Sequence, residues 1–277
     1  HHARRQRRQL GEDGLYILAN EAHKRRSKIE LTRPMVTGDL VRDWRTETVP
    51  AVWLYDTDLT LLELADLPGT ARYFWPARSS ISKRKRFGTP MVDRGLTWYE
   101  YQELYVNKLR TPLTITFSFV STHNHFILDR GGKVFKQSAP VIKLPDGASE
   151  DSYLGLLAVL NSSVACFWCQ QVCHNKGGPG GGSSKDEKWH DFFEFSSTAL
   201  AELPLVEARP VDLGRAIDAL ATELSAALPA ALFHESTKSH LPPPTRLQLD
   251  TACTKANGLR RRMIGLQGNR LAVLRPI

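Results

Sequence analysis

Hydrophobic positions follow a strand-like pattern in the middle of the chain. Four runs are rich in β-branched and aromatic residues and are separated by short polar turns: 113–120, 125–129, 133–135 and 141–144. Such residues favour strands, and short turns favour antiparallel neighbours. The pattern therefore predicts an antiparallel meander over residues 113–144, with further short strands at 51–55 and 192–195.

Towards the C-terminus the apolar positions recur with a helical period. Ser149 precedes Glu150 and Asp151, so its hydroxyl can cap a helix whose first turn carries two carboxylates. The apolar pattern continues to about Val172, which predicts one long helix. The Ala- and Leu-rich residues 213–228 predict a second helix.

Two further segments of the N-terminal half predict turns and helices. Met35–Trp44 indicates a turn that leads into a short helix, where Gly38 permits the turn and Asp39 provides the cap. Residues 58–67 predict a helix that ends at Pro68.

Strands are followed by helices rather than alternating with them, which indicates an α+β fold. We expect a mixed, mainly antiparallel sheet with loops, a helical C-terminal part, and no Rossmann-like core. The predicted organisation is a basic, partly ordered segment at 1–34, a main domain at 35–206, a helical segment at 207–234, and a basic, poorly ordered tail at 235–277 with a short helix at 258–267.

The net charge of +8 is distributed in blocks. Residues 1–45, 72–110 and 255–277 are basic, whereas residues 46–71 and 191–254 are acidic. Basic blocks interrupted by acidic ones predict one positive face that attracts phosphates. The alternative interpretation is an ordinary solvated basic surface.

The segment 72–110 interleaves cations with aromatic residues. The cations of Lys83–Arg86 suit phosphate binding, and Trp98, Tyr99 and Tyr101 are able to stack on bases. The alternative is a solvated helix face whose aromatic neighbours pack in the core.

The segment His123-Asn124-His125 has three readings: ordinary turn or surface residues, contact with nucleic acid, and a metal pair. Strand alternation would place both histidines on one side. A metal site needs two further ligands that the sequence does not assign.

The four cysteines do not form a disulfide framework in a chain of 277 residues, so a reducing cytosol is expected. Cys166, Cys169 and Cys173, followed by His174, resemble a zinc cluster at first sight. The same spacing describes one stripe of the predicted helix, and we favour packing in the core.

Other motifs give weaker indications. Pro145-Asp146 and the later Asp186-Glu187-Lys188 loosely match a nuclease core, whereas GGPGGGSSK at 177–185 departs from the phosphate-binding glycine loop of nucleotide hydrolases. There is no apolar run of membrane-spanning length and no signal peptide. The chain lacks an initiating Met, so we expect a fragment of a longer protein that is truncated or frameshifted at both ends.

Several strings follow one another in a characteristic order: VTGDLVRDW (36–44), RSSISKRKRFG (78–88), WYEY (98–101), RTPLTITFSFVSTHNHFILDRGGKVF (110–135), SAPVIKL (138–144), LGLLAVLNSS (154–163), HNKGG (174–178) and FFEFSSTALAELPL (192–205). Together they resemble the C-terminal specificity half of large adenine-specific DNA methyltransferases, the BREX phage-defence type and its type IIG restriction–modification relatives. The ending at 268–277 does not fit that family.

The resemblance implies a target-recognition domain at 35–206 that reads double-stranded DNA. The family's S-adenosylmethionine site and adenine-pocket motif are expected in another domain, so this chain would hold no cofactor and no metal and would not transfer methyl groups alone. The expected partners are DNA, the methyltransferase domain and other proteins of a defence system, in the cytoplasm and away from membranes. The candidates for DNA contact are Arg42, Arg110, His123, Asn124, Arg130, Lys133, Asn175 and Lys176, with Arg78, Lys83, Arg84 and Arg86 for phosphates.

Two other classes of function stay open on the sequence. One is a metal-dependent DNA nuclease that uses His123 and His125, or Asp146 and Asp186. The other is a non-catalytic scaffold whose basic face binds an acidic protein of a defence complex.

Overall fold

The computed structural model describes residues 12–268, apart from 20–22, 24–26, 43, 87, 103–108, 110–111, 179–190, 206, 208 and 240. The chain forms two compact units that interleave along the sequence. Unit 1 comprises His1–Val36, Glu47–Pro112 and Gly131–Lys136, and unit 2 comprises Thr37–Thr46, Leu113–Arg130 and Gln137–Ile277.

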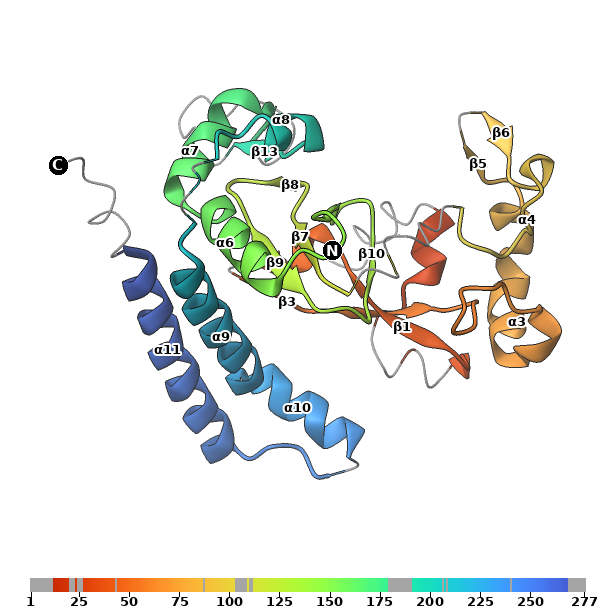
Figure 1. The fold of residues 1–277 in the computed structure, drawn as a ribbon. Helices are drawn as coiled ribbons and strands as arrows, with labels where there is room; N and C mark the ends of the chain where they lie inside the picture. Colours follow the sequence, from red (N-terminus) through yellow and green to blue (C-terminus); the bar gives the residue numbers. More distant parts are fainter. Residues whose placement is uncertain are drawn as a thin grey trace. The chain divides into compact units, whose positions relative to one another are not determined.

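The described residues of unit 1 form short strands, 3-10 turns (η) and the short helices α3 and α4 (Figure 1). Its elements are η1 (Glu12–Tyr16), β1 (Thr32–Val36), β4 (Val49–Val52), η3 (Leu64–Asp66), α3 (Pro68–Phe74), η4 (Trp75–Ala77), α4 (Arg78–Ile81), β5 (Lys85–Arg86), β6 (Thr89–Pro90), η5 (Val92–Arg94) and β10 (Val134–Phe135). β1 pairs antiparallel with β4 and parallel with β10, and β5 pairs with β6 in a hairpin.

An aromatic cluster forms the core of unit 1. The ring centroid of Tyr16 lies 5.0 Å from that of Phe74 and 4.8 Å from that of Tyr101. Trp53 and Tyr55, 5.2 Å apart, continue the cluster along the chain after β4. Tilted rings at these distances are favourable beyond the area that they bury.

Unit 2 contains the longer helices. Its elements are η2 (Gly38–Leu40), β2 (Val41–Arg42), β3 (Arg45–Thr46), β7 (Thr114–Phe117), β8 (Val120–Ser121), β9 (Phe126–Asp129), β11 (Val141–Ile142), α6 (Glu150–Leu160), α7 (Ser163–Val172), β12 (His174–Gly177), β13 (Phe192–Glu194), α8 (Ser197–Ala201), α9 (Val211–Ala227), α10 (Pro229–Lys238) and α11 (Arg246–Gly268). β7 lies between β9 and β11, and β13 lies between β12 and β8, all antiparallel.

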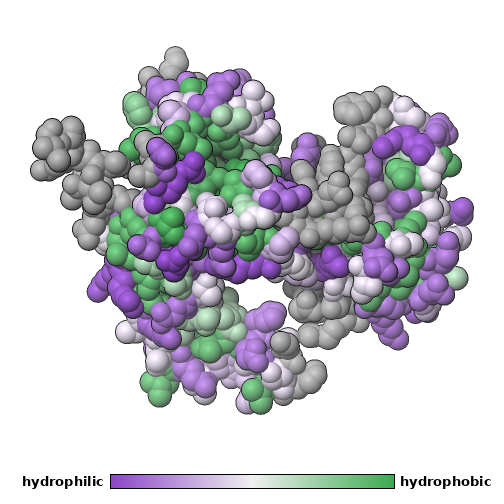
Figure 2. All heavy atoms as spheres, in the orientation of Figure 1, coloured by the Kyte–Doolittle hydropathy of each residue, from purple (hydrophilic) through white to green (hydrophobic). Residues whose placement is uncertain are grey.

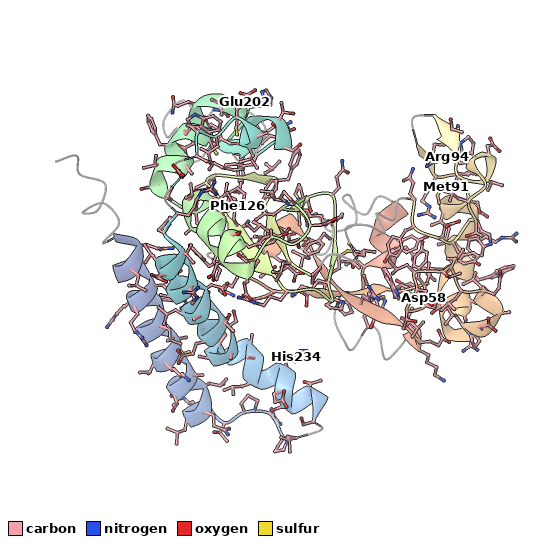
Figure 3. The ribbon with its side chains drawn as sticks, in the orientation of Figure 1. Asp58, Met91, Arg94, Phe126, Glu202 and His234 are labelled. Carbon is pink, nitrogen blue, oxygen red and sulfur yellow. The ribbon has the colours of Figure 1, made fainter. Side chains whose placement is uncertain are left out.

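The core of unit 2 lies where α6 packs on β9 and α9 packs on α6 (Figure 1). Phe126, labelled in Figure 3, is buried with its ring centroid 5.1 Å from that of Phe117. Gly214 of α9 permits the close approach of the two helices, because a Cβ there would lie 2.5 Å from the carbonyl oxygen of Leu154. α11 runs beside α9 and buries Ala256, Leu259 and Met263.

The expected fold class is confirmed: small, mainly antiparallel sheets accompany helices, and the described residues contain no Rossmann core. The expected meander is wrong in detail. Its strands are divided among three sheets, because β10 pairs with β1, β8 pairs with β13, and only β7, β9 and β11 pair with one another.

The single long helix predicted up to Val172 is two helices, α6 and α7, bent by 65°. Ser149 caps α6 as expected, because its Oγ accepts a hydrogen bond from the Ser152 N–H. A second cap, Ser162, begins α7 by accepting from the Ala165 N–H. Serine at both starts explains the two helices.

Three other predictions of helices need correction. Pro68 begins α3 instead of ending a helix, which suits a residue that lacks an N–H. Asp39 does not cap the three-residue turn η2, and Gly38 serves a close approach, since a Cβ there would lie 2.1 Å from the Ser138 carbonyl oxygen. The tail at 235–277, expected to be poorly ordered apart from a short helix at 258–267, contains the last residues of α10 and the 23-residue α11.

No single helix of the described ranges has the length and apolar character of a membrane span, although the bent pairs α6–α7 and α9–α10 together reach that composition.

Candidate nucleic-acid interface

The loop between β8 and β9 holds the His-Asn-His segment. Asn124 is partly buried, and its Nδ2 donates to the carbonyl oxygens of Leu160 at 2.5 Å and Ser162 at 3.2 Å. These bonds satisfy the last carbonyl groups around the α6–α7 bend. Asn124 therefore positions the loop, and its amide nitrogen is already bonded within the chain.

The two histidines of this loop have different environments. His123 is exposed and His125 is buried, with ring centroids 4.2 Å apart. His123 Nδ1 lies 2.9 Å from the hydroxyl of Thr122. Its exposed edge is available to an acceptor or a phosphate, whereas His125 packs beneath it.

β12 presents three exposed polar residues in succession: His174, Asn175 and Lys176. Asn175 Nδ2 donates to Asp191 at 2.8 Å, and its Oδ1 accepts from the Gly177 N–H at 2.7 Å. Lys176 forms an ion pair with Glu194 of the neighbouring strand β13. The sheet therefore holds Asn175 and Lys176 in place, and His174 is exposed beside them.

Three other candidates are engaged or partly covered. Arg42 donates to the carbonyl oxygens of Gly38 and Val41, at 2.9 and 2.5 Å, within its own turn. Arg130 forms ion pairs with Glu150 and Asp218, each at 2.6 Å. Burial opposes the charge of Arg130, but the hydrogen bonds to these two carboxylates raise its pKa overall. Lys133 is partly buried beside β10.

The basic block of unit 1 contains both surface and core residues. Arg78 and Lys83 are exposed, as a phosphate contact requires. Arg84 is only 2% exposed, and its guanidinium donates to the carbonyl oxygens of Ile81, Trp98 and Glu100. Arg84 is therefore removed from solvent, and its guanidinium is bonded within the core of unit 1. The side chain of Arg86 and the whole of Arg110 lie outside the described residues.

Two exposed features were absent from the candidates for DNA contact. One is Trp75, 63% exposed and adjacent to Arg78. The other is the exposed arginine triplet of α11, Arg260–Arg262, which lies in the short helix predicted at 258–267 of the basic tail. A signal for α11 was present: Thr245 and Gln248 form a reciprocal capping box, in which Gln248 N–H donates to the Thr245 Oγ1 at 3.3 Å and Thr245 N–H to the Gln248 Oε1 at 2.8 Å.

The metal and nuclease readings gain no support from the described ranges, where no group of three or more metal-binding side chains occurs. Cys169 and Cys173 are buried in the core of unit 2, which agrees with the packing interpretation. Asp146 is exposed and paired with Lys143 at 3.0 Å, and Asp186 lies outside the described residues.

Exposed apolar side chains accompany the polar ones of unit 2. Val164 and Phe167 of α7 are 57% and 67% exposed, and Figure 2 shows hydrophobic atoms among polar ones on the surface in this region.

No family model matches the chain. The chain is 37% identical over 263 residues to the adenine-specific methyltransferase PglX of Streptomyces coelicolor, and the matched part is 92% of this chain and 21% of that protein. The chain thus spans about a fifth of the length of this relative. Among solved structures, the Type IIL restriction-modification enzyme MmeI in complex with DNA aligns with a TM-score of 0.48 and 14% identity, over 95% of this chain and 33% of that one. The chain is homologous to one segment of an adenine-specific methyltransferase.

Proposed function

We propose that this chain binds duplex DNA and reads its sequence as part of an adenine-specific DNA methyltransferase of a phage-defence or restriction–modification system. The observation that carries the proposal is the 37% identity to an adenine-specific methyltransferase over 92% of the chain. Enzymes that modify a base within a duplex must bind the strands around it, and this need supports a DNA-binding role for a segment of such an enzyme.

The exposed side chains of each unit suit this role. In unit 1, Arg78 and Lys83 can neutralise phosphates. In unit 2, His123, His174 and Lys176 lie on a loop and a strand that hydrogen bonds hold in place. Imidazole and ammonium donors on a rigid scaffold can contact phosphates and base edges.

Methyl transfer is a separate matter. An S-adenosylmethionine site in a doubly wound domain needs a strand, a glycine-rich turn and a helix in a parallel sheet. The described residues contain no such unit, and their single parallel pair, β1 with β10, is not joined by a crossover helix of this kind. The residues do not fit the cofactor, so we assign methyl transfer to another part of a longer protein.

Fluorescence anisotropy with a labelled duplex tests the proposal. We expect the 277-residue chain to bind, and the affinity to fall by at least tenfold between about 50 and 200 mM salt. Lys83→Gln should reduce the slope of log K against log salt by about 0.9. Arg215→Gln is the charge-matched control, because Arg215 is already paired with Asp151 and Asp212. Absence of binding at the lower salt concentration would refute the proposal.

A further inference from the structure

Trp75 is an exposed tryptophan at the break between two short helices. α3 ends at Phe74, which is fully buried, and the next turn, η4, contains Pro76. Because Phe74 points into the core, the side chain of the next residue, Trp75, points to solvent and is 63% exposed. A single exposed apolar side chain is common on protein surfaces, so the role of Trp75 depends on the groups around it.

Arg78, at the start of α4, lies against this ring. Its guanidinium carbon is 5.0 Å from the ring centroid of Trp75 and 5.6 Å from that of Trp98. No ion pair of the described residues involves Arg78, and its side chain is exposed. A guanidinium held beside aromatic rings without a carboxylate partner still has N–H donors available to an oxyanion.

The position of Trp98 is set from within the core. Arg84 Nη2 donates to the carbonyl oxygen of Trp98 at 3.2 Å and to that of Glu100 at 2.8 Å. The Arg84 carbonyl oxygen in turn accepts from the N–H of Met91, a fully buried residue labelled in Figure 3. The buried arginine therefore supports one of the rings against which the exposed arginine lies.

The surroundings favour an anionic ligand. Residues 72–94 contain a single acidic residue, Asp93, and the exposed cations among their described side chains are Arg72, Arg78, Lys83, Lys85 and Arg94. A duplex offers phosphates at regular intervals with apolar deoxyribose between them, which suits a cation next to an exposed indole.

We infer that Trp75 and Arg78 form a binding pair for the DNA backbone, in which Arg78 donates to a phosphate and Trp75 covers the adjacent deoxyribose. This inference rests on the proposed function. It adds Trp75 to the DNA contacts and says which part of the backbone each of the two side chains contacts. The guanidinium is already ordered on the rings, so less side-chain entropy is lost when the phosphate binds.

The test uses the 277-residue chain, a labelled duplex and a salt titration. Arg78→Gln should weaken binding by about tenfold at low salt and reduce the salt slope by about 0.9. Arg78→Lys should keep the slope but weaken binding by about threefold, because an ammonium does not stack as a guanidinium does. Trp75→Ala should also weaken binding about threefold at an unchanged slope, and Trp75→Phe should restore most of the loss.

Two further measurements keep the outcomes distinct. Duplex DNA should quench the tryptophan fluorescence of the wild type more than that of Trp75→Phe. Inorganic phosphate at the same phosphate concentration should quench the wild type much less than the duplex does. Thermal unfolding should be unchanged in all four variants, because both side chains are exposed. Arg215→Gln again controls for the loss of one charge.

If the wild type does not bind DNA, the proposed function fails. If the wild type binds, and Arg78→Gln retains the wild-type affinity and slope, the inference alone is overturned. Equal quenching of the wild type and Trp75→Phe, or quenching by inorganic phosphate as strong as that by the duplex, would likewise overturn it.

Discussion

Asn161 and the main chain of Phe126 exchange two hydrogen bonds. The Phe126 N–H donates to Asn161 Oδ1 at 2.9 Å, and Asn161 Nδ2 donates to the Phe126 carbonyl oxygen at 2.8 Å. The side chain of Asn161, the residue that follows α6, thus bonds to the first residue of β9 as a neighbouring strand would. The bend between α6 and α7 and the edge of the β7–β9 sheet are therefore fixed together.

Asn161→Ala should lower the free energy of unfolding by about 2 kcal/mol, because it leaves two partly buried main-chain groups without partners. Urea denaturation measures the change. The matched control is Asn257→Ala on the exposed side of α11, which should shift the free energy by no more than about 0.5 kcal/mol. Equal losses in the two variants would contradict this role of Asn161.

Two helical glycines should respond oppositely to the same substitution. A Cβ at Gly214 would lie 2.5 Å from the Leu154 carbonyl oxygen, whereas a Cβ at Gly258 would meet nothing within 4 Å. Gly214→Ala should therefore destabilise the chain by about 1–3 kcal/mol, as α6 and α9 are forced apart. Gly258→Ala should stabilise it by up to about 1 kcal/mol through helix propensity. Thermal or urea unfolding distinguishes the two, and a stabilising effect at Gly214 would show that the helices approach less closely.

The elements that the sequence predicted well are those determined by local chemistry. Ser149 with two following carboxylates marks the start of α6, and the apolar period of residues 213–228 corresponds to α9 over Val211–Ala227. The β-branched runs correspond to strands β7 and β9. In each case the residues that decide the structure are close together in the chain.

Several features that the sequence did not predict involve partners distant in sequence. Asn161, which follows α6 at the bend, is bonded to the main chain of Phe126, 35 residues away. Arg84 is indistinguishable by type from its neighbours Lys83 and Lys85, and only the carbonyl groups of Trp98 and Glu100 explain its burial. The pairing of β10 with β1 joins a strand of the predicted meander to a strand much earlier in the chain and outside the meander, which no local period encodes.

Substitution of Arg84 should change the stability of the chain, whereas substitution of Lys83 should change its DNA binding. Arg84→Lys should lower the free energy of unfolding by about 2 kcal/mol, because an ammonium cannot reach three carbonyl groups in the geometry of a guanidinium. Lys83→Gln should leave stability within about 0.5 kcal/mol of the wild type and reduce only the salt slope of DNA binding. Unfolding and anisotropy measured on both variants check this. The assignment of Arg84 to the core would be wrong if Arg84→Lys unfolded like the wild type.

Arg130 should matter for stability more than for DNA contact. Its partner Asp218 has a side chain only 10% exposed, so Arg130→Gln leaves a largely buried carboxylate without its cation. The expected loss is about 1–2 kcal/mol in the free energy of unfolding. A double-mutant cycle with Asp218→Asn should show coupling between the two residues. A loss of DNA affinity at unchanged stability would instead favour the original expectation of a DNA contact.

Cys169 should be protected from modification where Cys253 is not. Burial raises the pKa of the Cys169 thiol to about 12, with smaller contributions from Cys173 and Cys166, whereas Cys253 is exposed on α11. In the native chain a thiol reagent at about pH 8 should label Cys253 rapidly and Cys169 only on unfolding, because the thiolate is the reactive form. Mass spectrometry of the labelled peptides identifies the sites.

The same pKa gives a pH dependence with a definite sign. Above about pH 8.5 the unfolded chain releases the Cys169 proton, while the native chain retains it up to about 12. The unfolded state then binds fewer protons, so the free energy of unfolding falls as the pH rises through this window. Cys169→Ala lacks the titrating group, and its free energy of unfolding should therefore decline less than that of the wild type between about pH 8 and 10. Parallel declines in the two proteins would show that Cys169 is not buried as a neutral thiol.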